Sequence, residues 1–249
     1  MFIIGSVIST ICLIISFMVF DTSIGLISTL LITIAMTPFM VSLNRYEEAK
    51  QEREASKEVT PLDELNFLQR YRDILKIYTA FFCGTILSFS IIFMVLQDQT
   101  SSLIFQDQIN EIKAIRGMVT FTDTFSKIVT NNIGVLFLSF LFSFLFGAGA
   151  IFILAWNASV LSIAIGTLAR TLGGVKALPL ALLPFLPHGM LEILAYFIGA
   201  IAGGIVSAAI TRRKSHKFLF IVKDGLKLMG VSMVLLIVAA FIESSQLLL

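Results

Sequence analysis

The chain has 249 residues, of which 57% are hydrophobic and 14% are charged, and its mean hydropathy is +0.95. Soluble globular proteins are roughly 45–50% apolar, so this composition excludes a soluble domain. The formal net charge of +2 gives no reason to expect a nucleic-acid partner. Both cysteines, Cys12 and Cys83, lie within apolar runs, and they predict neither a disulfide framework nor a metal cluster.

Apolar runs long enough to cross a bilayer, which takes about 20 residues, recur along the whole chain. We predict an all-α polytopic bundle with seven crossings, near residues 2–20, 24–43, 77–96, 132–155, 158–178, 187–211 and 228–247. The first run lacks the basic n-region and the small-residue cleavage site of a secretory signal, so we expect it to be a retained helix.

The fifth crossing differs from the others because glycines and prolines interrupt it and the segment that follows. These residues are Gly166, Gly173, Gly174, Pro179, Pro184 and Pro187. We therefore expect residues 158–187 either to cross as a straight helix or to form a broken or re-entrant one. Irregular backbone at membrane depth would need protein or a water-filled cavity beside it.

The basic residues predict the orientation of the chain. Residues 44–76 hold seven basic side chains among eight acids, and the loop 212–227 holds six against one acid, whereas residues 98–127 hold three against four. Because Lys and Arg near span ends set topology, we predict a multi-pass protein of the cell membrane with a cytoplasmic N-terminus and an outside C-terminus. Arg170 and Lys176 then lie toward the outer end of the fifth crossing, where they snorkel or face protein.

The one sizeable outer segment, residues 98–130, has the pattern of an amphipathic helix. Its apolar residues recur at three- and four-residue spacings, which is typical of a helix lying along a surface. They are Leu103, Ile104, Ile109, Ile112, Ile115, Met118 and Val119. A connector packed on its own bundle is favoured over a helix that docks a partner.

His188 and Glu192 stand one helical turn apart at the start of the sixth crossing. On a helix they share a ridge with small residues at three- and four-residue steps, namely Ala195, Gly199, Gly203 and Ser207. Small residues in this spacing let a second helix approach closely, as in the Gly-x-x-x-Gly pattern. We therefore expect His188 and Glu192 to face protein or a cleft and not the lipid.

Two interpretations of this polar pair remain open. In the first, Glu192 is neutral or is hydrogen-bonded to His188 or to Asn131, Asn132 or Asn157, and it locks the bundle. In the second, which follows from the cost of burying ionisable groups in hydrocarbon, His188 and Glu192 hold or pass a proton or cation. Asn132 opens the fourth crossing, where it also fits a helix cap, and Asn157 follows its end. A metal site is disfavoured because the pair supplies only two ligands.

The chain lacks several common enzyme signatures. It carries no His-Glu-x-x-His, no Gly-x-Ser-x-Gly and no Walker-type Gly-Lys-Ser/Thr string. We therefore predict that the protein is not an enzyme and binds no cofactor.

Several motifs in the C-terminal two thirds resemble one protein family. The Asn131-Asn132 step, the Leu154-Ala-Trp-Asn157 step and the string Pro187-His-Gly-Met-Leu-Glu192 are similar to those of the stage II sporulation protein M family. The resemblance marks the family-type residues Asn132, Asn157, Pro187, His188, Gly189 and Glu192 as an intramembrane polar site. The chain has Asn157-Ala158 where the family tends to have Asn-Gly.

The resemblance also implies an organisation and a role. It covers roughly residues 70–249, so we predict an N-terminal transmembrane hairpin at 1–43, a cytoplasmic polar connector at 44–76 and a five-span domain at 77–249. The family's namesake holds partner enzymes at a septal membrane, which implies a membrane scaffold with membrane or envelope protein partners. We expect a homo-oligomer built through the small-residue faces. The alternative hypothesis is a transporter or channel for an ion or small solute that uses His188 and Glu192.

Overall fold

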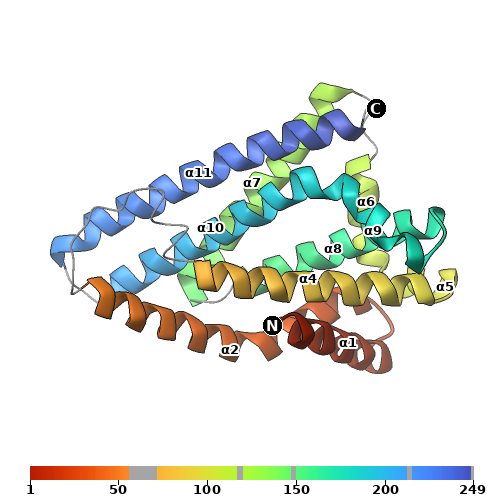
Figure 1. Ribbon diagram of the computed structural model, residues 1–249, viewed down its shortest axis with the longest axis horizontal. Helices are drawn as coiled ribbons and strands as arrows, with labels where there is room; N and C mark the ends of the chain where they lie inside the picture. The colour runs from red at the N-terminus through yellow and green to blue at the C-terminus, as the bar shows by residue number, and fades with distance from the viewer. Residues whose placement is uncertain (56–71, 117–119, 147–149, 212–214, 248–249) are drawn as a thin grey trace.

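The structure, a computed structural model, describes residues 1–55, 72–116, 120–146, 150–211 and 215–247 (Figure 1). Every regular element within these ranges is a helix. Seven helical segments are long and apolar enough to cross a membrane, and they run along the length of the molecule (Figure 1). The prediction of an all-α bundle with seven crossings is confirmed.

Seven long helices follow one another along the described parts of the chain. They are α1 (Phe2–Val19), α2 (Ile24–Ala55), α4 (Arg72–Val95), α7 (Phe121–Phe146), α8 (Ala150–Thr171), α10 (Leu186–Thr211) and α11 (Ser215–Leu247). Shorter elements lie between α4 and α7, namely α5 (Asp98–Ile104) and α6 (Gln106–Arg116). Between α8 and α10 come η1 (Val175–Ala177), α9 (Leu178–Leu182) and η2 (Leu183–Phe185).

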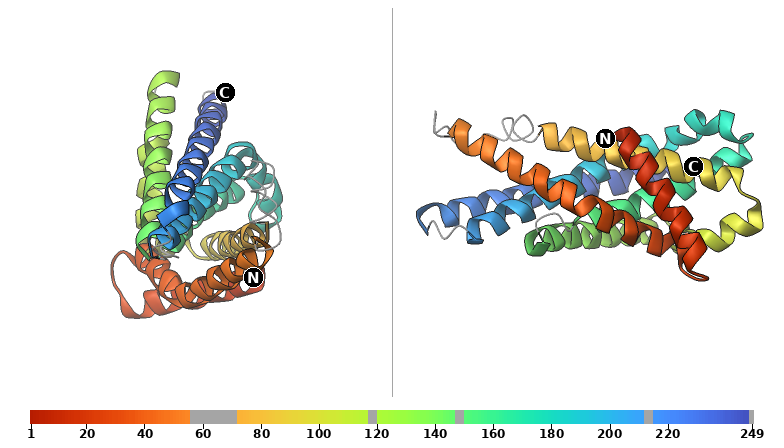
Figure 2. Two further views of the ribbon diagram at one scale, coloured as in Figure 1. Left: turned by 90° about the vertical axis from the view of Figure 1, so that its left-hand side faces the viewer. Right: turned by 90° about the horizontal axis from the view of Figure 1, so that it is seen from below.

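The crossings form two packed groups. Helices α1, α2, α4 and α8 pack together, and α7, α10 and α11 form a second group; the left view of Figure 2 shows α7 and α11 far from α1 and α2. Aromatic side chains join the groups, because the Phe197 ring of α10 lies 5.5 Å from the Tyr78 ring and 6.3 Å from the Phe82 ring of α4. Since water drives no apolar association inside a bilayer, such close packing is what holds the groups together.

Small and hydroxyl residues let α1 and α4 approach closely. A Cβ added to Gly5 would lie 2.7 Å from the Phe81 carbonyl oxygen. Between the same helices Ser9 donates a hydrogen bond to Thr85 at 3.0 Å, and the hydroxyls of Thr10 and Ser88 lie 2.7 Å apart. This pattern of glycine and hydroxyl contacts is the one expected between membrane helices.

The predicted bounds of the fourth and fifth crossings are wrong. α7 begins at Phe121 and ends at Phe146, and α8 begins at Ala150 and runs without a break to Thr171. The apolar run continues through this region, so hydropathy alone does not mark where one helix stops. Asn157 consequently lies in the interior of α8, not after the end of a crossing, and Asn132 lies well inside α7, not at its start.

The irregular backbone follows the end of α8 and opens the next candidate span, Val175–Ser207. Gly173 and Gly174 take φ values of 115° and 87°, a left-handed region that favours glycine because it has no Cβ. The chain then passes through η1, α9 and η2 before α10 begins at Leu186. Of the two alternatives for 158–187, the straight helix therefore holds for 158–171, and the irregular backbone is confined to 172–185.

The outer segment packs on its own bundle. Phe105 and Gln108 are fully buried, and the Gln108 side-chain amide donates to Ser159 of α8 at 3.2 Å. A Cβ on Gly25 of α2 would meet the Gln108 side chain. α5 and α6 thus form the packed connector that the amphipathic pattern favoured, although Met118 and Val119 lie outside the described residues.

Arg170, near the end of α8, faces protein. Its guanidinium donates to Asp98 at 2.7 Å and to Ser101 at 3.1 Å, and it also reaches the carbonyl oxygens of Phe93 and Leu96. These two carbonyls belong to the last turn of α4 and the residue after it, where helical carbonyls lack intrahelical partners. Arg170 therefore caps α4 and fixes α5 against α8.

The predicted hairpin 1–43 is part of the same bundle, with α1 against α4 and α2 against α8. Residues 56–71 of the predicted connector 44–76 lie outside the described residues. Within it, α2 extends to Ala55 and α4 begins at Arg72.

Candidate functional site

The predicted site begins at the first turn of α10. Leu186 starts this helix, and Pro187 falls in its first turn, where a missing backbone N–H costs no helical hydrogen bond. The next turns place His188 and Glu192 on one face, toward α7 and α11. His188 is 8% exposed, and Glu192 is half-buried within a candidate span.

Glu192 is the centre of a polar cluster that joins three helices. The Asn132 side-chain amide of α7 donates a hydrogen bond to Glu192 Oε1 at 2.6 Å. The Glu192 carboxyl also lies close enough to the carboxyl of Glu243 on α11 for the two groups to interact electrostatically. Two carboxyl groups bond to each other only if one of them carries a proton, because an ionised carboxylate has no donor. The two side chains are therefore suited to share one proton.

His188, one turn before Glu192 on α10, makes a second contact with α11, near the end of that helix. Its Nδ1 lies 2.9 Å from Oε1 of Gln246, a residue whose side chain is exposed. With an amide oxygen as acceptor, His188 Nδ1 carries the proton of this bond. The Phe185 ring packs edge-on against the imidazole, with centroids 6.2 Å apart. Among the described hydrogen bonds, Glu192 thus takes Asn132, one of the partners that the sequence offered, and not His188, which bonds to Gln246.

The small residues of the ridge lie against α7. Ala195 is fully buried, and a Cβ on Gly199 would meet the Leu136 side chain. A Cβ on Gly203 would lie 3.0 Å from the Phe144 backbone nitrogen and would also meet the backbone of Phe140. Ser207, one turn further, is half-buried. This ridge is already occupied by a helix of the same chain, so it is not a free face for a second copy.

Three predicted site residues do not contact the polar cluster through the described hydrogen bonds. The Asn157 amide donates to the Ile153 carbonyl of its own helix at 2.8 Å. Pro187 is exposed, and a Cβ added to Gly189 would meet no atom within 4 Å. Asn131, the neighbour of Asn132, reaches only the Asn132 side chain, at 3.4 Å.

Sequence reasoning missed the α11 half of the site. Glu243 and Gln246 stand one turn apart near the end of the last crossing. Glu243 could have been singled out from the sequence, because an ionisable residue inside an apolar run is by default a candidate functional residue. Nothing in the sequence, however, shows that Glu243 faces Glu192.

The geometry limits the chemistry of the site. Among the described residues, no group of three or more His, Cys, Asp or Glu side chains is placed to hold a metal ion. The cluster offers two neighbouring carboxyls, an amide that fixes one of them, and an imidazole one turn away. It can hold a proton and bind three helices to one another.

The fold and this cluster define a polytopic helical membrane protein with a carboxyl pair buried between its last crossings. The model of the family described as stage II sporulation protein M matches residues 27–245, and the chain belongs to that family. An uncharacterised protein of Methanocaldococcus jannaschii is 36% identical over 124 residues, which make up 48% of this chain and 68% of the relative. No solved structure matches the chain.

Proposed function

We propose that the protein is a non-enzymatic membrane scaffold that anchors or assembles partner proteins at the cell membrane. The observation that carries this proposal is that polar side chains of α7, α10 and α11 contact one another between the helices. Asn132 of α7 donates a hydrogen bond to Glu192 of α10, and the carboxyl of Glu243 on α11 lies beside Glu192. His188 of α10 adds a second link to α11 through Gln246. Such bonds fix the relative positions of the helices, which is what a docking platform requires.

The exposed face of α6 is the proposed docking surface, at the same end of the bundle as the polar cluster (Figure 1). Gln106, Asn110 and Lys113 are exposed there at helical spacing, while Phe105 and Gln108 hold the helix on the bundle. The proposed partners are membrane or envelope proteins. Because the Gly199 and Gly203 ridge is occupied by α7, a homo-oligomer would have to use another face.

In-cell crosslinking tests the scaffold proposal. A photocrosslinking residue at position 110 should capture a discrete set of membrane or envelope proteins after purification. The matched control carries the same residue at Val234, an exposed apolar position on α11 that is expected to face lipid. If both positions capture the same proteins, or if neither captures any, the scaffold proposal is lost.

The proposed orientation places the end that holds the α10–α11 junction in the cytoplasm and α5 outside, as the basic residues of 212–227 favour. In a Cys12→Ala, Cys83→Ala background, a cysteine at exposed Ser102 should react with an impermeant maleimide in intact cells, and a cysteine at Lys223 should react only after lysis. The opposite labelling pattern would reverse the topology.

A second candidate function is proton transfer, and the proximity of the Glu192 and Glu243 carboxyls favours it. Gln246 is exposed and bonds to His188, so polar groups lead from the end of α11 toward the pair. Proteoliposomes that contain a trapped pH dye distinguish the two functions. Proton leak that Glu192→Gln and Glu243→Gln abolish, and that Glu111→Gln on α6 leaves unchanged, would support transfer. A parent protein without leak would exclude it.

A further inference from the structure

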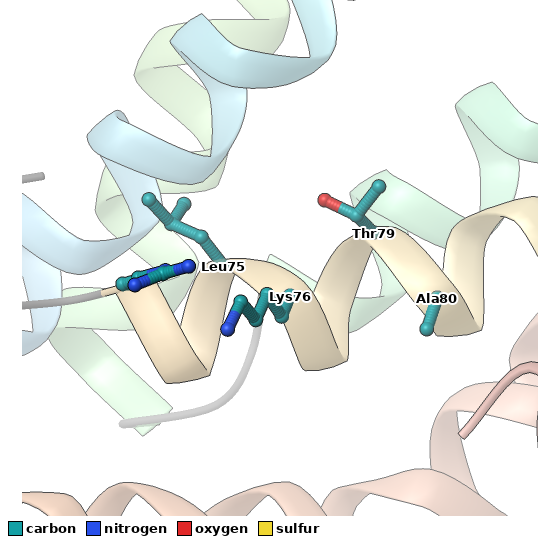
Figure 3. Close-up of a pocket in the computed structure, with 5 residues that line it drawn as sticks. Leu75, Lys76, Thr79 and Ala80 are labelled. Atoms are coloured by element: carbon teal, nitrogen blue, oxygen red, sulfur yellow. The ribbon is translucent and has the colours of Figure 1, made fainter. Parts of the chain in front are cut away.

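The first turns of α4 carry a hollow of about 410 Å³ that is separate from the polar cluster (Figure 3). The residues that line it are Arg72, Leu75, Lys76, Thr79 and Ala80. Figure 3 shows Leu75 and Thr79 projecting to one side of this helical face and Lys76 and Ala80 to the other. The hollow is thus lined by two cationic side chains, one hydroxyl and apolar surface.

The cationic groups of the hollow are accessible to a ligand. Arg72, Lys76 and Thr79 are exposed. Lys76 makes an ion pair with Asp73 at 3.9 Å, but the two side chains are 60% and 57% exposed. An exposed ion pair of this kind contributes little stability, so the Lys76 ammonium can turn toward a stronger anion at small cost. Leu75 and Ala80, both half-buried, supply the apolar wall.

The hollow lies at the level where headgroups meet hydrocarbon. The candidate span of α4 begins at Leu75, so Arg72 lies just outside the apolar segment and Lys76 just inside it. Long basic side chains at such positions extend toward the interface. α4 begins on the same side of the bundle as the end of α10 and the start of α11 (Figure 1).

We propose that this hollow binds the headgroup of an anionic phospholipid from the surrounding bilayer. Arg72 and Lys76 neutralise the phosphate, and the Thr79 hydroxyl is placed to donate to it. The acyl chains lie along Leu75 and Ala80. The two cations favour a negatively charged ligand. The apolar wall of Leu75 and Ala80, at the start of a crossing, favours an anion with a hydrocarbon tail over a soluble phosphate. Basic pockets at membrane helices commonly recognise lipid headgroups in this way.

Native mass spectrometry of the detergent-purified protein, titrated with phosphatidylglycerol or with phosphatidylcholine, tests the proposal. The parent should retain phosphatidylglycerol in preference to phosphatidylcholine. Removing each cation should weaken retention about fivefold, so the double variant Arg72→Gln, Lys76→Gln should lose about 30-fold. Thr79→Phe, which keeps both charges but fills the hollow, should also weaken retention.

The matched control is Lys127→Gln, Lys176→Gln, which removes two exposed cations, one from the first turns of α7 and one from the link between α8 and α10, at the opposite end of the bundle (Figure 1). It should change retention less than twofold. Equal binding of the two lipids by the parent, or an equal loss in the control, would overturn the proposal. Competition by inorganic phosphate as effective as that by phosphatidylglycerol would also overturn it and would assign the hollow to a soluble anion.

Discussion

The packing of α10 on α7 makes Gly203→Ala a sharp test of the structure. An added Cβ would lie 3.0 Å from both the Phe140 carbonyl carbon and the Phe144 backbone nitrogen, and it would meet the Phe140 carbonyl oxygen as well. These are backbone atoms, which cannot rotate away as a side chain does. One of the two helices must therefore shift to accommodate a single methyl group.

The magnitude follows from two opposing effects. Overpacking of a tight contact costs about 1–3 kcal/mol, whereas Gly to Ala in a helix interior gains up to about 1 kcal/mol in propensity. Gly134→Ala on α7 is the matched control, because a Cβ there meets no atom within 4 Å. The control should gain propensity without the clash, so the two variants should differ by about 1–3 kcal/mol in unfolding free energy.

Equilibrium unfolding in mixed micelles, followed by circular dichroism, measures this difference. Thermal midpoints should separate in the same order, with Gly203→Ala below the parent and Gly134→Ala at or above it. If Gly203→Ala is as stable as Gly134→Ala, α10 and α7 are not in backbone contact at this point. The placement of Glu192 against Asn132 would then lose its support.

Three further predictions concern polar contacts inside the bundle. Asn132→Ala should destabilise the protein by about 1–2 kcal/mol by removing the donor to Glu192, whereas Asn131→Ala should change stability by less than half as much; equal effects in urea titrations would contradict the site geometry. Arg170→Met should cost about 2–4 kcal/mol because it uncaps α4 and frees α5, and hydrogen exchange should rise at α5; unchanged protection there would count against the capping role. Gln108→Leu should be nearly neutral in thermal unfolding, because the buried Gln108 Oε1 has no hydrogen-bond partner in the structure to offset its desolvation; a loss above about 2 kcal/mol would mean that this oxygen is bonded.

Only part of the candidate site could be predicted from the sequence. His188 and Glu192 stood out because an ionisable pair in an apolar run is energetically costly and so calls for shelter by protein. Glu243 carries the same signal, yet its partner could not be chosen, because its orientation depends on how α11 rotates against α10. Asn132 was among several candidate partners for Glu192, and only the packing of α7 selects it.

The helix boundaries, too, were predicted correctly from the sequence only in part. The runs that became α1 and α10 have clear polar or proline ends, and their predicted bounds agree closely with the structure. The region from Asn132 to Asn157 is nearly continuous in hydropathy, so the helix break between Phe146 and Ala150 was misplaced. α7 also begins earlier than expected, at Phe121.

The sequence by itself determined that the chain spans the membrane as an all-α bundle, because backbone polar groups in hydrocarbon must be satisfied within each helix. It also determined which face of α10 is buried, since only small residues at helical spacing permit a close helix neighbour. The tertiary structure decided which helix fills that face and which side chains complete the cluster. Those choices depend on contacts between segments far apart in the chain, and hydropathy and spacing carry no information about them.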